Sequence, residues 1–288
     1  EGVKYPPHIK EKLDNALASI VNAEKDEERL GAMTGYSEEM EEAKAEQERR
    51  MELVEFGEEK IHRFELEALK KLIDEINKKV LPEQRKTYPD TKESKLEDAK
   101  WLFKIVVENN SIVEFKILNG FMIEVPEAVN ELVFLTKLRI YGTLQKITNV
   151  TQLTKLHLLD LSGCREIQDI SKLEELPQLE VLNINSCGLT SLTGIEKLVN
   201  LTQLGLDRNK LNTVEGISNL KKLQQLDLGR NKFKEYSELE ELKELPDLES
   251  LWLNENEFVN LDGIQSMLDD LPDGVEVVMN ENCVIENF

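Results

Sequence analysis

Large apolar residues recur along residues 112–288 in a pattern that repeats about every 22 residues. The pattern Leu-x-x-Leu-x-Leu-x-x-Asn-x-Leu is clearest in the copies that begin at Leu201, Leu223 and Leu248. Counting the weaker copies, repeats start at 112, 135, 156, 179, 201, 223, 248 and about 274. We therefore expect seven full repeats followed by a terminal strand.

The Leu-x-Leu part of each repeat predicts a short strand with one buried face, because successive strand side chains point to opposite sides. Asn209, Asn231 and Asn256 occupy the turn that follows, where an amide can satisfy backbone groups inside the stack. Cys164 and Cys187 take the same position in two earlier repeats. Stacked positions are close enough for a disulfide bridge, but we expect two buried thiols.

A second apolar ladder with a three-residue step lies between the strands, as in Leu192, Ile195 and Leu198. This step favours short 3₁₀ segments on the side opposite the sheet. The longer repeat that starts at Leu223 is expected to hold a proper α-helix there.

Residues 1–110 have the period of helices. A stripe from Ile9 to Val21 predicts one helix, and the proline-free segment from Ser37 to Leu81, with Gly57 as a weak interior residue, predicts a long second one. We expect the two helices to pair as an antiparallel hairpin, with self-association through an exposed coiled-coil contact as the alternative.

A third helix is expected to begin at Ser94, because Ser94 and Glu97 form a capping-box pattern. It would cover the open end of the repeat stack, which otherwise exposes apolar side chains. The predicted domains are a helical extension at 1–84, a linker at 85–93, a capping helix at 94–110 and the repeat domain at 111–288.

The repeats resemble those of the leucine-rich-repeat superfamily. The pairs Gly194-Ile195, Gly216-Ile217 and Gly263-Ile264, and the stretch 194–209, are similar to the 22-residue class of bacterial internalins and of a nuclear regulatory subunit of protein phosphatase 1. The resemblance implies an α/β solenoid, a horseshoe with a parallel sheet on its concave face, here preceded by an all-helical N-terminal region. Its members share a scaffold and differ in their ligands, so it implies a binding module without naming the partner.

Side chains that alternate with the buried leucines should point together from the concave sheet, where a protein partner would bind. They run from basic and aromatic at the N-terminal end to acidic and polar at the C-terminal end. The candidate binding residues are Lys116, Arg139, Tyr141, Asp160, Asn183, Asn185, Asp207, Asp227, Trp252 and Asn254. Trp252 is the leading candidate, because tryptophan often anchors protein interfaces.

The net charge of −21 argues against a nucleic-acid partner, which would require clustered lysine and arginine. No apolar run approaches the roughly 18 residues of a membrane span. His8, His62 and His157 are isolated, and no His-Glu-x-x-His, Cys-x-x-Cys, phosphate-loop or nucleophile-elbow pattern occurs. The sequence therefore predicts no metal, no cofactor and no enzymatic activity.

Protein recognition through the concave face is the preferred function. The alternatives are a targeting solenoid of a bacterial effector with an unrecognised catalytic activity, and a structural protein that self-associates through its N-terminal helices. Three cysteines are too few for a disulfide framework and favour a cytosol, that of the cell itself or of a host. The internalin-like repeats favour a bacterium, and a secreted or surface-bound bacterial protein is the alternative to the slightly favoured cytosol.

Overall fold

A computed structural model describes much of the chain. The described residues are 43–46, 48–49, 51–56, 59–79, 103–120, 124–258, 263–280 and 283–286. The chain divides into two compact units, Glu1–Leu66 and Glu67–Phe288, and the boundary falls within the residues of helix α3 (Arg63–Lys79). The domain boundaries predicted from the sequence remain predictions.

The first unit contains helical residues at 43–46, 48–49 and 51, followed by an antiparallel hairpin of β1 (Leu53–Phe56) and β2 (Glu59–His62). The long helix predicted for Ser37–Leu81 is therefore wrong at the hairpin, and the N-terminal region is not all helical. The helix predicted at Ile9–Val21 lies outside the described residues.

The hairpin has a local cause. Val54 and Ile61 are seven positions apart, a spacing that fits a helical stripe, yet they are cross-strand partners in the hairpin. Branched and aromatic side chains such as Val54, Phe56 and Ile61 favour strands over helices. Their residue types thus outweighed a spacing that both structures can accommodate.

The second unit begins with residues 67–79 of α3, and Ala68, Leu69 and Leu72 are buried. Lys71 Nζ lies 2.7 Å from Glu131 Oε1, and the Glu75 carboxylate accepts a hydrogen bond from the backbone N–H of Glu127. Both partners belong to the 3₁₀ helix η3 (Glu127–Glu131). This part of α3 therefore packs beside the first repeat.

The predicted capping helix at 94–110 is wrong for the part that the structure describes, because Phe103–Glu108 form strand β3. Three consecutive branched residues, Ile105 to Val107, oppose a helix. Asn109 and Asn110, with φ of +52° and +62°, make a tight turn into β4 (Ser111–Gly120). Asparagine tolerates this left-handed conformation, and two such residues in succession are typical of hairpin turns.

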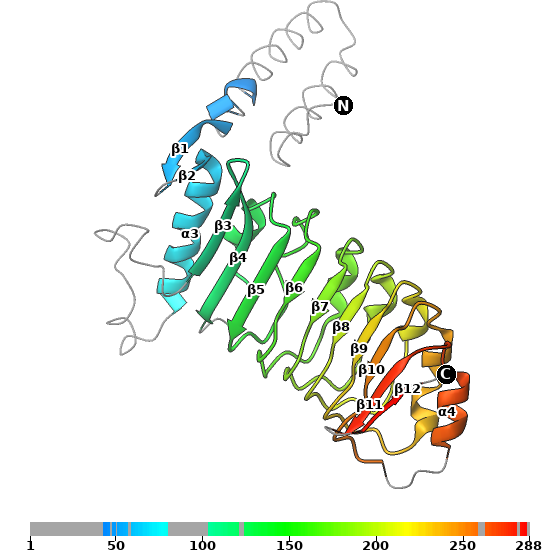
Figure 1. The fold of residues 1–288 in the computed structure, drawn as a ribbon. Coiled ribbons are helices and arrows are strands. Elements are labelled where there is room, and N and C mark those ends of the chain that lie inside the picture. The colour runs from blue at the N-terminus through cyan, green and yellow to red at the C-terminus, as the bar shows by residue number, and fades with distance from the viewer. Residues whose placement is uncertain are drawn as a thin grey trace, which may run out of the picture. The chain divides into compact units, whose positions relative to one another are not determined.

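All strands described in the second unit form one sheet in the order β12-β11-β10-β9-β8-β7-β6-β5-β4-β3 (Figure 1). Strands β4 to β11 are parallel, and the end strands β3 and β12 (Cys283–Glu286) are antiparallel to their neighbours. The remaining parallel strands are β5 Lys137–Gly142, β6 Leu158–Asp160, β7 Val181–Asn183, β8 Gln203–Gly205, β9 Gln225–Asp227, β10 Ser250–Trp252 and β11 Glu276–Asn280. The predicted parallel sheet of about eight strands is confirmed.

The interior is a stack of apolar side chains from the parallel strands, most of them leucines. Leu159, Leu182, Leu204 and Leu226 are paired in register and at most 2% exposed. The turn asparagines complete this interior as predicted. Asn231, for example, accepts a hydrogen bond from the Leu211 N–H and donates to the carbonyls of Leu206, Leu228 and Gly229.

Short 3₁₀ helices lie behind the sheet, as the three-residue ladder predicted (Figure 1). After η3 they are η4 Ser171–Glu175, η5 Ile195–Lys197, η6 Ile217–Asn219 and η7 Tyr236–Glu244, and the last repeat has α4 Ile264–Asp270. Gly194 and Gly216 precede η5 and η6 with φ of +96° and +91°, a turn that disfavours side chains.

The α-helix predicted for the long repeat is wrong, because η7 is a 3₁₀ helix. Tyr236, Leu239 and Leu242 are spaced by three residues and are all buried. A 3₁₀ helix has three residues per turn and keeps them on one side, whereas at 3.6 residues per turn they would fan away from the core.

Candidate functional site

The outward side chains of the parallel strands form a continuous surface, which we call the sheet face. One outward residue from each parallel strand belongs to a row that we call the first column. In strand register each of these residues is paired with the next: Lys116, Arg139, Asp160, Asn183, Gly205, Asp227, Trp252 and Val278. A second column follows two residues later in each repeat. Hydrogen bonds from the N–H groups of Ser186, Arg208 and Arg230 to the carbonyls of Asp207, Gly229 and Asn254 link these turns from repeat to repeat.

At the N-terminal end of the sheet face, charged and aromatic groups bind one another. Arg139 forms an ion pair with Glu114, and the Lys116 ammonium lies 5.0 Å from the centre of the Tyr141 ring. The Tyr141 hydroxyl donates to Asp160 Oδ2 at 2.8 Å. Burial, with a further contribution from this hydrogen bond, raises the pKa of Tyr141 to about 12. The predicted residues Lys116, Arg139, Tyr141 and Asp160 thus lie close together, and their polar groups are already bound within the chain.

The middle of the sheet face is built from amides. Asn185 Oδ1 accepts a hydrogen bond from the backbone N–H of Asp207 at 2.8 Å. A Cβ on Gly205 would lie 2.6 Å from Asn183 Oδ1 and 3.0 Å from the Asn185 amide. Both amides therefore lean over bare backbone and give this part a neutral polar surface.

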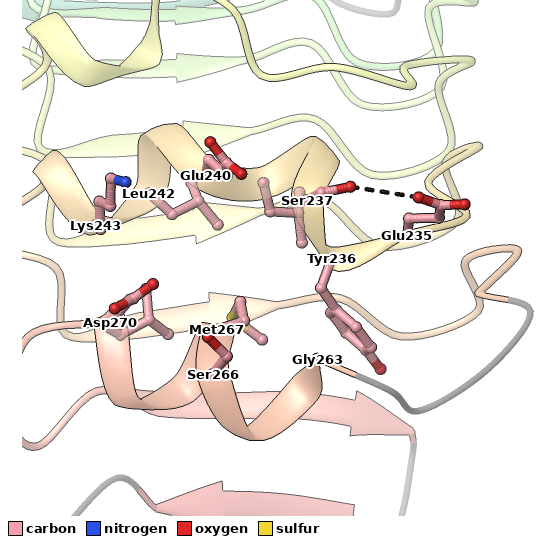
Figure 2. A pocket seen from close by; sticks show the side chains of 12 residues that line it. Glu235, Tyr236, Ser237, Glu240, Leu242, Lys243, Gly263, Ser266, Met267 and Asp270 are labelled. Atoms are coloured by element: carbon pink, nitrogen blue, oxygen red, sulfur yellow. Dashed lines mark hydrogen bonds between the residues drawn. The ribbon is translucent and has the colours of Figure 1, made fainter.

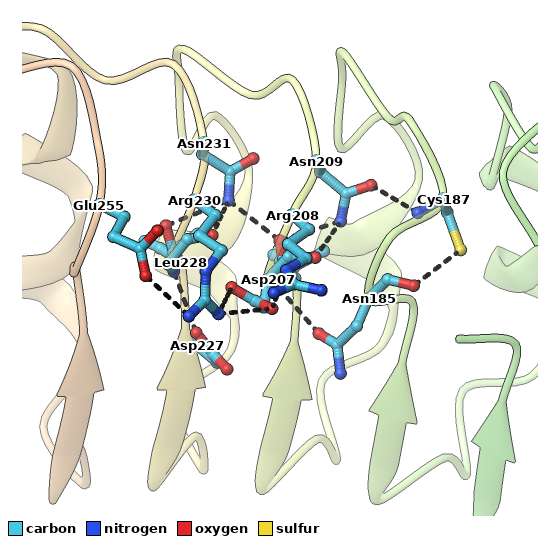
Figure 3. Close-up of polar contacts among 12 residues, drawn as sticks. Asn185, Cys187, Asp207, Arg208, Asn209, Asp227, Leu228, Arg230, Asn231 and Glu255 are labelled. Atoms are coloured by element: carbon cyan, nitrogen blue, oxygen red, sulfur yellow. Dashed lines mark hydrogen bonds and ion pairs between the residues drawn. The ribbon is translucent and has the colours of Figure 1, made fainter. Parts of the chain in front are cut away.

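Farther along, Arg230 bridges two carboxylates (Figure 3). Its guanidinium lies 3.2 Å from Asp207 Oδ1 and 2.7 Å from Glu255 Oε1. The Glu255 hydrogen bond, followed by the negative charge of Asp207, raises the pKa of Arg230. The Asp207 side chain is 18% exposed, so this pair is more sheltered than the outer contact with Glu255, which is 53% exposed.

Asp227 and Trp252 are neighbours in the first column, and both are half-buried. Asp227 Oδ1 accepts the backbone N–H of Gly229 at 3.0 Å, and no ion pair among the described residues includes this carboxylate. Burial raises the pKa of Asp227 and the charge of Asp207 raises it further, while the Gly229 hydrogen bond and the charge of Arg230 lower it in part. The C-terminal end of the sheet face thus presents a tryptophan beside an acid that forms no ion pair within the described part of the chain.

Sequence reasoning missed Glu114 and Arg230, which bind the predicted residues Arg139 and Asp207. Glu255, the residue after Asn254, pairs with Arg230. Arg208, Arg230 and Glu255 share a position directly before the turn asparagine, and all have a left-handed backbone, with φ between +52° and +56°. That position is visible in the sequence as the residue before Asn209, Asn231 and Asn256. The turn lifts these side chains beside the second column.

Interior and metal chemistry add little to the site. Cys164 and Cys187 are free, buried thiols, as expected, and donate to the carbonyls of Ile140 and Leu161. Burial raises the pKa of both, that of Cys187 to about 12, which keeps the thiols protonated. Within the described residues, no group of at least three His, Cys, Asp or Glu side chains could hold a metal ion.

A pocket with a volume of about 480 Å³ lies between η7 and α4 (Figure 2). Its floor is apolar, including Leu239, Leu242 and Met267, and its rim carries Glu240 and Asp270. The Tyr236 hydroxyl beside it is buried and has no hydrogen-bond partner within the described part of the chain. Burial also raises the pKa of Tyr236.

None of the described helices is both long enough and apolar enough to cross a membrane.

Comparison with known proteins places the fold. No protein-family model and no curated protein matches this chain. Among solved structures, an internalin (inlF) from Listeria monocytogenes matches with a TM-score of 0.52 and 20% identity, over 74% of this chain and 55% of its own. Internalin C2 (inlC2) from the same bacterium matches with a TM-score of 0.48 and 19% identity, over 69% of this chain and 88% of its own.

The chain thus spans about half the length of the inlF internalin, and the likeness concerns its fold. Together with the parallel sheet and the 22-residue period, it shows a leucine-rich-repeat solenoid with internalin-like repeats, as the sequence resemblance implied.

Proposed function

We propose that this chain is a non-catalytic protein-recognition module whose partner binds the sheet face around Trp252, Asp227 and Asp207. The repeat fold supports the general class, because leucine-rich-repeat solenoids present a broad sheet surface to protein partners. The other predicted binding residues, from Lys116 to Asn185, would lie along the same partner's footprint.

One observation favours the C-terminal end of the sheet face as the place where the partner binds. Trp252 is held outward by strand alternation, half-buried, beside a carboxylate that forms no ion pair with a described residue. Aromatic anchors flanked by polar groups are typical hot spots of protein interfaces. At the N-terminal end, by contrast, Arg139 and Tyr141 already bind Glu114 and Asp160.

The test is affinity capture of a partner by the whole chain, followed by titration of variants. Trp252→Ala should weaken binding about thirtyfold, which corresponds to about 2 kcal/mol. Lys197→Ala is the matched control, because Lys197 is exposed in η5 behind the sheet. Both variants must unfold at the wild-type urea concentration within error. Equal affinities of the two variants would refute the role of the sheet face.

A second candidate function is self-association through the first unit. Met51 and Leu53 are each 42% exposed next to and within its hairpin, two positions apart, and a second copy of the chain could cover both. Light scattering of the whole chain should then show an oligomer that Leu53→Asn reduces to a monomer. A wild-type monomer at all concentrations contradicts this candidate.

A further inference from the structure

One edge of strand β3 pairs with no other strand within the described residues. β3 is an end strand of the ten-stranded sheet, and its recorded partner is β4 (Figure 1). In an antiparallel pair, alternate residues direct their backbone N–H and C=O groups toward the neighbouring strand, and the residues between them direct theirs away. β3 therefore presents a row of backbone donors and acceptors with which another strand can pair.

The residues of β3 do little to protect this edge. Edge strands of monomeric proteins are commonly blocked by a proline, a bulge or a charged residue in the middle of the strand. The middle of β3, residues 105–107, consists of three branched apolar residues, all partly exposed. The irregularity of the pair lies in β4, where Val113 is the extra residue, because Glu114 and Ile112 pair with consecutive residues of β3. The strand at the edge is itself regular.

The sequence of β3 is complementary to itself in an antiparallel pair. If two copies pair with Val106 opposite Val106, Lys104 of each copy lies opposite Glu108 of the other. In the same register, Ile105 lies opposite Val107. Opposite charges and branched apolar side chains are both favourable as cross-strand pairs. The whole strand thus matches a second copy of itself.

The two charged residues of β3 are available for such a pair. Lys104 and Glu108 are exposed, and neither forms an ion pair with a described residue. Within the chain, Lys104 lies opposite Lys116 of β4 in the strand register, and like charges in this position repel each other. A glutamate of a second copy, on the other side of Lys104, would offset this repulsion.

The charge near this end of the sheet also favours the approach of a second copy. Strands β3, β4 and β5 together carry four basic and two acidic side chains, whereas the whole chain has a net charge of −21. Repulsion between two copies is therefore weaker here than the net charge of the chain suggests.

We propose that two copies of this chain pair through the free edges of β3, in the antiparallel register centred on Val106. This contact is twofold symmetric and closes at two copies. It joins the two sheets edge to edge, with both sheet faces on the same side, because paired residues point to the same face. The contact lies in the second unit, unlike the self-association considered for the first, and it does not depend on the partner-binding function.

Charge reversal tests this register without removing a backbone group. Lys104→Glu would place two glutamates opposite each other at both symmetry-related contacts, and Glu108→Lys would do the same with lysines. Lys104→Glu should not harm the folded chain, because the new glutamate would lie opposite Lys116. The double variant with both changes restores the opposite charges. Lys197→Glu is the matched control, because it makes the same change of charge at an exposed site in η5 behind the sheet.

The measurement is light scattering of the whole chain over a series of concentrations at physiological salt. The wild type should show a reversible equilibrium between monomer and dimer, and a weak one, because a single pair of strands buries little surface. We expect each single reversal to raise the dissociation constant of the dimer at least about tenfold, the double variant to return within about threefold of the wild type, and Lys197→Glu to change it less than about twofold.

Hydrogen exchange of the wild type gives a second readout. Backbone N–H groups of residues 103–108 that point to the free edge should exchange more slowly at high protein concentration than at low concentration, because the second copy supplies their acceptors. Equal exchange of this segment at concentrations where the dimer forms would contradict the pairing.

Several results of the scattering experiment would overturn the proposal. A wild type that stays monomeric at every concentration, a dimer that neither reversal weakens, or a double variant that stays as weak as the single ones would each do so. Growth beyond two copies would also do so, because it would indicate open, head-to-tail pairing of β3 with β12. If Leu53→Asn disrupts the dimer and the charge reversals do not, self-association belongs to the first unit instead.

Discussion

At the N-terminal end of the sheet face, Arg139 and Tyr141 bind Glu114 and Asp160, while at the C-terminal end Asp227 binds no described cation. Both ends were predicted as binding surface from the same alternation of residues. Their difference lies in what stands beside each charged group, an opposite charge or a hydroxyl at one end and a glycine at the other. A polar residue that points outward is therefore available to a partner only where its neighbours leave it unsatisfied.

The interior of the repeat stack also differs between its N-terminal half and its C-terminal half. Cys164 and Cys187 each donate a thiol hydrogen bond to a carbonyl of the preceding repeat, and Asn209 and Asn231 make the equivalent bond through an amide. The amide oxygen, in addition, accepts a backbone N–H, that of Leu211 for Asn231. Asparagine thus satisfies both kinds of backbone group in the C-terminal half.

The largest predicted effect concerns these interior residues. Asn231→Ala should lower the free energy of unfolding by about 3 kcal/mol, because it leaves a buried N–H and buried carbonyls without partners. Cys187→Ala should cost only about 1 kcal/mol, since a thiol is a weak donor and little volume is removed. Urea unfolding of both variants gives the two values. Equal losses would contradict the difference between the halves.

The second prediction concerns the N-terminal end of the sheet face, where polar side chains bind one another. Tyr141→Phe should cost about 1 kcal/mol at neutral pH, because Asp160 loses its donor. The folded pKa of Tyr141 is raised above that of the unfolded chain, so the phenol ionises more easily after unfolding. Its contribution is complete below pH 10.0 and is lost as the pH rises to about 12.

Thermal unfolding between these pH values measures that loss. The wild type should lose stability more steeply than Tyr141→Phe over this range, because phenylalanine cannot ionise. Parallel curves for the two proteins would show that folding does not raise the pKa of Tyr141.

The fold could be predicted where the sequence repeats, except in the long repeat, where the expected α-helix is the 3₁₀ helix η7. The leucine rows, the turn asparagines and the first outward column all follow from one period, since an error in one repeat would be visible against the others. The strands β1 to β3 have no repeat to support them. Val54 and Ile61 fit a helix by spacing, and Asn109 and Asn110 signal a turn only once the branched run before them is read as a strand.

The binding candidates could be predicted as a surface but not as a network. Arg230 has a left-handed backbone, and the three-dimensional structure is needed to see that its guanidinium contacts Asp207 and Glu255. The crowding around Gly229 depends likewise on side chains of Asp207, Asp227 and Asn254, which come from different repeats. Such lateral relations depend on twist and rotamer, which a periodic pattern does not specify.

The third prediction asks whether unsatisfied polar groups are a property of the C-terminal half as a whole. The hydroxyls of Tyr236 and Thr148, one in each half, are buried without a hydrogen-bond partner in the described residues. Tyr236→Phe and Thr148→Val should each leave stability unchanged or raise it by up to about 1 kcal/mol, because both remove an unsatisfied group. Similar gains in urea unfolding would locate the difference between the halves on the sheet face alone. A loss in either variant would reveal a partner for that hydroxyl.

The smallest effect is expected at Asp227, and it has the opposite sign for stability and for binding. The folded pKa of Asp227 is raised, so ionisation costs the folded chain stability above that pKa and costs nothing below the ordinary pKa of an aspartate. Asp227→Asn keeps an oxygen for the Gly229 N–H and cannot ionise. It should therefore raise the free energy of unfolding at pH 7 by less than about 0.5 kcal/mol, and the gain should vanish as the pH falls through the range between the two pKa values.

The same variant should bind a captured partner more weakly, whereas Asp160→Asn, which keeps an oxygen for Tyr141, should change binding little. An Asp227→Asn chain that is less stable than the wild type at pH 7 would show that the charge of Asp227 is already satisfied within the chain, and the contrast between the two ends of the sheet face would then be lost.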